Sequence, residues 1–189
     1  MDSEKEFRAF LGIPLAEAFE VSVRPILQKL KREYPEVKWV KPSQLHLTLH
    51  FFGQIEAEAV TKISDCTLPV AEKTKPLKLF LKGIGGFPNL ERPRVIWAGI
   101  EGEVEALGEL QASLEHRFRR AGFPCEERSF KPHLTLGRVR EGKRVFFTEH
   151  PELDETERKQ ISEIILYWSV LSSEGPIYEK LQTYPLAAT

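Results

Sequence analysis

The chain has 189 residues, of which 41% are hydrophobic and 29% are charged, as in an ordinary globular domain. Its formal net charge is −1, so no overall charge bias indicates a nucleic acid or a membrane as partner. No apolar run approaches the roughly 20 residues that a membrane-spanning helix requires. The charged opening, residues 1–6, is unlike a secretory signal peptide. We therefore expect a cytoplasmic protein without membrane contact.

The first half of the chain predicts strands alternating with helices. The expected elements are a strand over 7–13, a helix over 15–33, a short strand over 37–40, a strand over 45–52 and a helix over 56–73. Pro25 predicts a kink or a late start in the first helix, and Pro69 breaks the end of the second. Gly53 is expected to end the strand that precedes the second helix.

The second half continues the same alternation. The expected elements are a strand over 77–84, a loop over 85–89, a strand over 94–100, a helix over 103–121, a strand over 133–140, and strands over 161–171 and 177–185 joined by a turn at 172–176. Strand, helix and strand recur in each half, without a flexible linker between them. We interpret residues 1–189 as one bilobal α+β domain with pseudo-two-fold duplication. Helices would flank two mostly antiparallel sheets around a central cleft.

One short pattern occurs twice within this arrangement, once in each half. The copies are His46-Leu47-Thr48-Leu49 and His133-Leu134-Thr135-Leu136. Side chains two residues apart on a strand share a face, so each copy presents an imidazole beside a hydroxyl and directs its leucines to the other face. The same alternation places His50 and Phe52 on the His46 face. Two such strands facing one another would surround one small site with two histidines and two threonines.

These residue types suit acid–base chemistry on a phosphate. Imidazole has an ordinary pKa of about 6.5, so it can accept or donate a proton near neutral pH. Displacement at phosphorus needs a base for the attacking oxygen and an acid for the leaving oxygen, and two histidines supply both without a metal. The hydroxyls of Thr48 and Thr135 can donate hydrogen bonds to the other phosphate oxygens.

Other kinds of site fit the pattern less well. His46 and His50 would lie roughly 13 Å apart along a strand, too far to chelate one ion, and neither motif strand contains an acidic residue. Cys66 and Cys125 lack metal-ligand spacing, and we expect them in ordinary structure rather than in a disulfide. No serine or cysteine occupies a nucleophile elbow. We therefore predict a site that uses neither metal nor cofactor.

The paired motifs resemble those of the two-histidine (2H) phosphoesterase superfamily. With Phe51-Phe52-Gly53 after the first copy and Gly137-Arg138 after the second, the chain is most similar to RNA 2′,3′-cyclic phosphodiesterases of the LigT, or 2′-5′ RNA ligase, type. The resemblance implies a bilobal fold with both histidines in a central cleft. It also implies hydrolysis of RNA 2′,3′-cyclic phosphate ends to 2′-phosphomonoesters. Ligation of RNA ends through a 2′-5′ linkage would be a secondary activity.

The resemblance assigns roles that the symmetric motifs leave open. By this resemblance His46 is the proton donor to the leaving oxygen and His133 is the proton acceptor that activates water. The expected partner is RNA with 2′,3′-cyclic phosphate termini, such as tRNA fragments or oligonucleotides, and nothing requires more than a monomer. Two alternatives stay open, namely a phosphodiesterase for another small cyclic nucleotide and a non-catalytic protein that binds RNA ends.

Flanking residues suggest how substrate would be held. Six basic residues and one acidic residue lie between Arg128 and Arg144, and among them Arg138 is the best candidate to grip a phosphate. Strict alternation directs Arg138 away from His133, so we predict a β-bulge at Gly137, or an equivalent twist, that redirects it. Phe52 could stack on a base from the His46 face.

Overall fold

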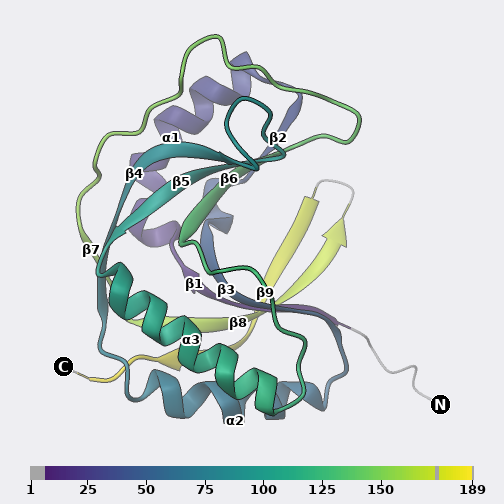
Figure 1. Ribbon diagram of the computed structural model, residues 1–189, viewed down its shortest axis with the longest axis vertical. Coiled ribbons are helices and arrows are strands. Elements are labelled where there is room, and N and C mark those ends of the chain that lie inside the picture. The colour runs from purple at the N-terminus through teal and green to yellow at the C-terminus, as the bar shows by residue number, and fades with distance from the viewer. Residues whose placement is uncertain (1–6, 173–174, 189) are drawn as a thin grey trace.

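The computed structural model describes residues 7–172 and 175–188, and Figure 1 shows their arrangement. In chain order the elements are β1 (Phe7–Pro14), α1 (Ala16–Glu33), β2 (Val37–Trp39), the 3-10 turn η1 (Pro42–Gln44), β3 (His46–Ile55), α2 (Ala59–Ala71), β4 (Leu77–Phe87), β5 (Val95–Gly102), α3 (Val104–Arg120), β6 (His133–Val139), β7 (Lys159–Ile161), β8 (Glu163–Ser172) and β9 (Gly175–Pro185). None of the helices in the described part of the chain is long and apolar enough to cross a bilayer.

The strands form two antiparallel sheets that face one another. The four-stranded sheet has the order β3-β1-β8-β9, and the five-stranded sheet has the order β2-β6-β5-β4-β7. Each sheet combines strands from distant parts of the chain, because β8 pairs with β1 and β7 pairs with β4. The predicted α+β architecture with two antiparallel sheets is confirmed.

The helices cover the outer faces of the sheets. Helices α2 and α3 pack together and lie beneath the four-stranded sheet, whereas α1 lies behind the five-stranded sheet near β2 and β7 (Figure 1). Each long helix buries one apolar stripe, as its spacing of apolar residues predicts. The buried residues of α3 are Leu107, Leu110, Leu114 and Phe118. Helix α1 begins at Ala16, so the expected late start is wrong, and the exposed Pro25 lies within it.

The prediction of a loop at residues 85–89 is wrong for residues 85–87, because β4 continues to Phe87. Gly85 pairs with Trp97 on β5, and the Trp97 ring lies over it. A Cβ atom at Gly85 would lie 2.3 Å from that ring, so a glycine is required where the strand passes under the indole. The two glycines at 85 and 86 therefore mark a close approach within a strand, and the loop begins at Pro88.

The single strand expected over 161–171 is divided in the structure. Residues Lys159–Ile161 pair with β4 in the five-stranded sheet, and Glu163–Ser172 pair with β1 and β9 in the other. Ser162 is the point at which the chain passes from one sheet to the other. The turn expected at 172–176 includes residues 173–174, which lie outside the described residues, and β8 and β9 pair up to Ser172 and Gly175.

Candidate active site

The two motif strands meet although they belong to different sheets. Strand β3 begins at His46, β6 begins at His133, and the two strands lie against one another. Both imidazoles are partly buried, and they are close enough for His133 to lower the pKa of His46. The predicted facing arrangement of the two histidines is therefore present, and it is built entirely from one chain.

Each histidine is held by the same backbone contact. Nδ1–H of His46 donates to the carbonyl oxygen of Gln44 over 2.8 Å, and Nδ1–H of His133 donates to that of Lys131 over 2.7 Å. In both cases the acceptor lies two residues earlier in the chain. A neutral ring that keeps its proton on Nδ1 leaves Nε2 free to accept a proton. Both Nε2 atoms are thereby prepared for proton transfer.

Aromatic rings fix the orientation of both imidazoles. The ring centroids of Phe10 and His46 lie 4.7 Å apart, and those of Tyr178 and His46 lie 5.0 Å apart in a T-shaped arrangement. Around His133, Phe87 makes an edge contact at 5.0 Å and Trp97 lies at 6.4 Å. These contacts restrict ring rotation and remove water from one side of each imidazole.

The pKa values of both histidines lie below the ordinary value of 6.5. Burial lowers the pKa of His46 most, with further lowering by the charge of Arg138 and by His133, against a raising effect of the Gln44 carbonyl. Burial also lowers the pKa of His133 most, the Lys131 carbonyl raises it, and Arg138 lowers it. The free protein at neutral pH therefore carries both imidazoles largely uncharged.

Both motif strands contain a β-bulge at the same position of the motif. On β3, Thr48 and His50 pair with the adjacent residues Gly12 and Leu11 of β1, so Leu49 is the additional residue. On β6, Thr135 and Gly137 pair with adjacent residues of β5, so Leu136 is the additional residue. One extra residue reverses the alternation of the side chains that follow it, and in β3 this holds up to a second register shift at Phe52.

The bulge in β6 redirects Arg138 toward the histidines. Arg138 is exposed, its charge adds to the lowering of the pKa of His46 and of His133 by burial, and it opposes the burial that raises the pKa of Tyr178. The predicted bulge before Arg138 is therefore confirmed, and the charge of this arginine acts on both imidazoles. Strand β2 adds Lys38, which is exposed and pairs directly with Arg138.

The bulge in β3 turns Phe52 away from the histidines, whereas the bulge in β6 turns Arg138 toward them. His50 and Phe52 are directed into the core, where Phe52 is 4% exposed and its ring contacts the rings of Phe118 and Phe123. The prediction that they share the His46 face, with Phe52 free to stack on a base, is wrong. That prediction requires uninterrupted alternation along β3, and the bulge at Leu49 interrupts it.

Phe51 occupies the place that Phe52 was expected to fill. It is 45% exposed and pairs with Phe10, whose ring contacts His46. Directly paired residues share a face, so Phe51 lies on the His46 side of the sheet. The guanidinium of Arg8 lies 5.6 Å above its ring. Phe51 follows the first bulge as Arg138 follows the second.

The threonines lie on the histidine faces, as the alternation before the bulges requires. Thr48 is exposed and Thr135 is partly buried. Gly12 pairs directly with Thr48 and has no side chain to cover its hydroxyl. Each threonine thus shares a strand face with the histidine of its motif.

Residues without a sequence signal line a cavity on one side of His46, and His133 is not part of that lining. A cavity of about 870 Å³ adjoins His46, and Gln44, Tyr167, Tyr178 and Lys180 contribute to its lining. Tyr178 and Lys180 come from β9, far from either motif in sequence, and the pairing of β9 with β8 brings them to this cavity. The basic residues predicted between Arg128 and Arg144 are all exposed.

Comparisons with known proteins identify the family of this chain. The sequence model of the LigT like phosphoesterase family matches residues 13–97 and 99–178. An RNA 2′,3′-cyclic phosphodiesterase of Methanothermobacter thermautotrophicus is 34% identical over 183 residues, covering 95% of this chain and 98% of that protein. The structure of TT0787 from Thermus thermophilus has a TM-score of 0.77 and 28% identity, covering 95% of this chain and 97% of that chain. The structure of Escherichia coli LigT complexed with 3′-AMP has a TM-score of 0.74 and 26% identity, with coverages of 97% and 100%. The chain therefore belongs to the LigT-like phosphoesterase family.

Proposed function

We propose that this protein hydrolyses RNA ends that carry a 2′,3′-cyclic phosphate to 2′-phosphomonoesters, without a metal ion. The observation that carries the proposal is the facing pair of imidazoles, each with Nδ1 held by the backbone and Nε2 free. The name of the Methanothermobacter relative, 34% identical over nearly its whole length, supports the same reaction.

The reaction needs one proton acceptor and one proton donor. We assign His133 as the acceptor, which removes a proton from water while the water oxygen attacks phosphorus. The P–O3′ bond then breaks, and protonated His46 donates its Nε2 proton to the leaving 3′ oxygen. The products are a 2′-phosphomonoester and a free 3′-hydroxyl, and solvent exchange returns both imidazoles to their starting states.

Substrate binding would adjust His46 for its role. The pKa of His46 is lowered in the free protein, chiefly by burial, which favours the neutral ring. A phosphate anion placed beside the ring favours the protonated form and offsets that effect. The substrate would thereby create the general acid that the reaction needs.

The remaining site residues would hold the phosphate and the nucleotide. Arg138 can form two parallel hydrogen bonds to the phosphate oxygens, and the hydroxyls of Thr48 and Thr135 can donate to others as negative charge develops. Phe51 offers an exposed ring for a base, in the role first expected of Phe52. Because both histidines come from one chain, a monomer suffices.

The direct test uses an RNA oligonucleotide ending in a 2′,3′-cyclic phosphate, incubated with the protein in EDTA. We expect complete conversion to the 2′-phosphate, and loss of turnover in His46→Ala and in His133→Ala. His116→Ala is the matched control, because His116 is exposed on α3. Chromatography against synthetic 2′- and 3′-phosphate standards identifies the product.

The same experiment separates the alternatives. Equal rates on the oligonucleotide and on a nucleoside 2′,3′-cyclic phosphate would favour a small-molecule phosphodiesterase. Tight binding of the oligonucleotide without hydrolysis would favour a protein that only binds RNA ends. A 3′-phosphate product would contradict the proposed direction of P–O cleavage.

A further inference from the structure

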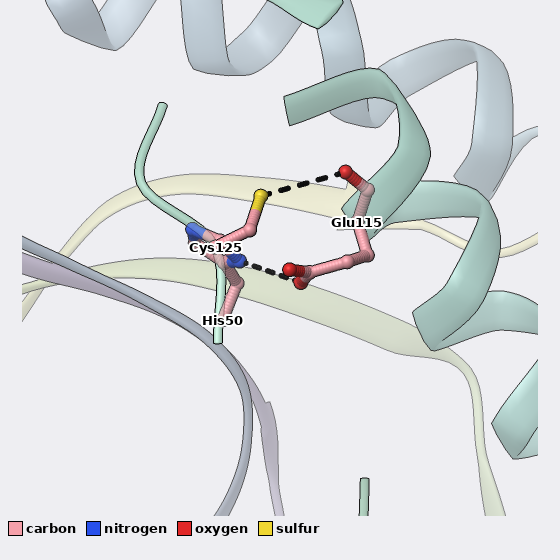
Figure 2. A group of neighbouring side chains, drawn as sticks. All are labelled: His50, Glu115 and Cys125. Atoms are coloured by element: carbon pink, nitrogen blue, oxygen red, sulfur yellow. Dashed lines mark hydrogen bonds and ion pairs between the residues drawn. The ribbon is translucent and has the colours of Figure 1, made fainter. Parts of the chain in front are cut away.

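Three potential ligand side chains meet on the side of β3 that faces away from His46. His50 comes from β3, Glu115 from α3, and Cys125 from the segment between α3 and β6 (Figure 2). Nδ1–H of His50 donates to Oε2 of Glu115 over 3.0 Å, and Sγ of Cys125 lies 3.7 Å from the Glu115 carbonyl oxygen. One nitrogen, one sulfur and one carboxylate oxygen all lie within 4.8 Å of one another.

Two polar atoms of this cluster are buried without a hydrogen-bond partner among the described residues. They are Nε2 of His50 and Oε1 of Glu115. His50 is 5% exposed, and the nearest cation to Oε1, the Arg119 guanidinium, stands 4.0 Å away. A buried polar atom left unpaired is unfavourable, so its presence calls for a ligand or another compensation. Both atoms carry lone pairs that a cation can use.

We propose that His50, Glu115 and Cys125 form a Zn²⁺ site. Imidazole nitrogen, carboxylate oxygen and thiolate sulfur are the ligand types that Zn²⁺ takes in proteins. Three atoms within 4.8 Å of one another have a common point about 2.8 Å from each, and Zn²⁺ ligands lie roughly 2.0–2.3 Å from the ion. Side-chain shifts of well under 1 Å would close the site, and water would complete a tetrahedron.

The charges of the site would balance. A thiolate and a carboxylate neutralise Zn²⁺, and the imidazole is neutral when it is a ligand. A free thiol carries a proton, which it loses when it becomes a thiolate ligand. Metal binding would displace that proton into solvent.

The surroundings favour a structural ion. The His50 ring lies 4.5 Å from that of Phe52 and 4.8 Å from that of Phe118, so apolar rings shield the imidazole, while Glu115 and Cys125 are partly exposed and leave room for a water ligand. The ligands join β3, α3 and the segment that leads into His133. A bound ion would therefore brace the strand and the segment that position the two catalytic histidines, without contact with the phosphate.

The experiment begins with protein that has been treated with EDTA and desalted, and then titrated with Zn²⁺ or with Co²⁺. We expect one ion per chain and, for Co²⁺, an absorption band from thiolate coordination. At 100 times the Kd, binding should raise the Tm by roughly 5–10 °C. Hydrolysis of the cyclic phosphate should be the same in EDTA, which distinguishes this site from the catalytic one.

Matched variants locate the ion. Cys125→Ser and His50→Gln should lose the stoichiometric ion and the Zn²⁺-dependent rise in Tm, and Cys125→Ser should also lose the Co²⁺ band. Cys66→Ser and His116→Gln should keep them, because Cys66 is a second free cysteine and His116 is exposed on α3. Cys125→Ser is nearly isosteric, so it decides the matter if His50→Gln does not fold.

Three outcomes would overturn the proposal. The first is the absence of stoichiometric binding in the wild-type protein. The second is undiminished binding in folded Cys125→Ser. The third is loss of binding in His46→Ala/His133→Ala with Cys125 intact, which would place the ion in the catalytic cleft.

Discussion

Nδ1 of His133 lies 2.7 Å from the carbonyl oxygen of Lys131, two residues earlier in the chain. His46 makes the same contact with Gln44. The acceptor is a backbone atom in both cases, so the tautomer of each motif histidine depends on the path of the chain into its strand and not on a carboxylate partner. The two histidines are thereby held in the same way, and the different roles that we propose for them would come from what surrounds them.

The first prediction assigns those roles through the leaving group. A general acid matters little when the leaving group is a good one, whereas the base is still needed. On the cyclic phosphate, His46→Ala and His133→Ala should each lower kcat by about 10²–10⁴-fold. On a nucleoside 2′-(p-nitrophenyl phosphate), His46→Ala should retain most of the wild-type activity, whereas His133→Ala should stay nearly inactive. The reverse pattern of recovery would exchange the two roles.

The second prediction concerns Arg138 and the pH dependence of kcat/KM. Burial is the main cause that lowers the pKa values of His46 and His133, and the charge of Arg138 lowers both further. The profile should be bell-shaped, with both apparent pKa values below 6.5. Removing the positive charge in Arg138→Gln stabilises the protonated imidazoles, so both limbs should move to higher pH while KM rises.

Arg138→Lys is the control for that experiment. It keeps the charge but lacks the planar pair of donors, so KM should rise while the limbs stay near their wild-type positions. Limbs that do not move in Arg138→Gln would show that its charge does not act on the catalytic rings.

The third prediction concerns stability. Both histidines have folded-state pKa values below the unfolded value of about 6.5, so the unfolded chain binds more protons below that pH. Their contribution therefore makes the free energy of unfolding fall as the pH drops through 6.5 toward the folded values, and has no effect well above it. The double variant His46→Asn/His133→Asn should lose less stability than wild type between pH 7.5 and pH 5 in urea titrations. His116→Asn should follow the wild type, and a double variant that also follows it would contradict the linkage.

The fourth prediction compares two adjacent phenylalanines. Phe52 is 4% exposed in the core, so Phe52→Ala should cost about 3–5 kcal/mol of stability. Phe51 is 45% exposed beside Arg8, so Phe51→Ala should cost less than about 1 kcal/mol but raise KM for the oligonucleotide. Unfolding in urea and steady-state kinetics measure the two effects. An unstable Phe51→Ala with an unchanged KM would contradict the bulged register of β3.

The sequence by itself determined which side chains share a face within each motif, and most of the secondary structure. A histidine two residues before a threonine on a strand shares its face, because side-chain direction over two residues is a local property of extended backbone. The apolar spacing that predicts α3 is likewise local. The helix spans Val104–Arg120, one residue shorter at each end than the predicted range 103–121. The family resemblance, carried by the same motifs, followed from these residues.

Only the tertiary structure decided which side chains beyond the motifs reach the cleft. Strand alternation is interrupted at Leu49 and Leu136 because each strand is held in register by hydrogen bonds to a neighbour distant in sequence. That register places Arg138 and Phe51 on the histidine faces and sends Phe52 into the core. The passage from β7 to β8 at Ser162, and the arrival of Tyr178 beside His46, depend on strand pairing in the same way. Such contacts join residues far apart in the chain, so they are settled by the packing of the two sheets and leave no local pattern to read.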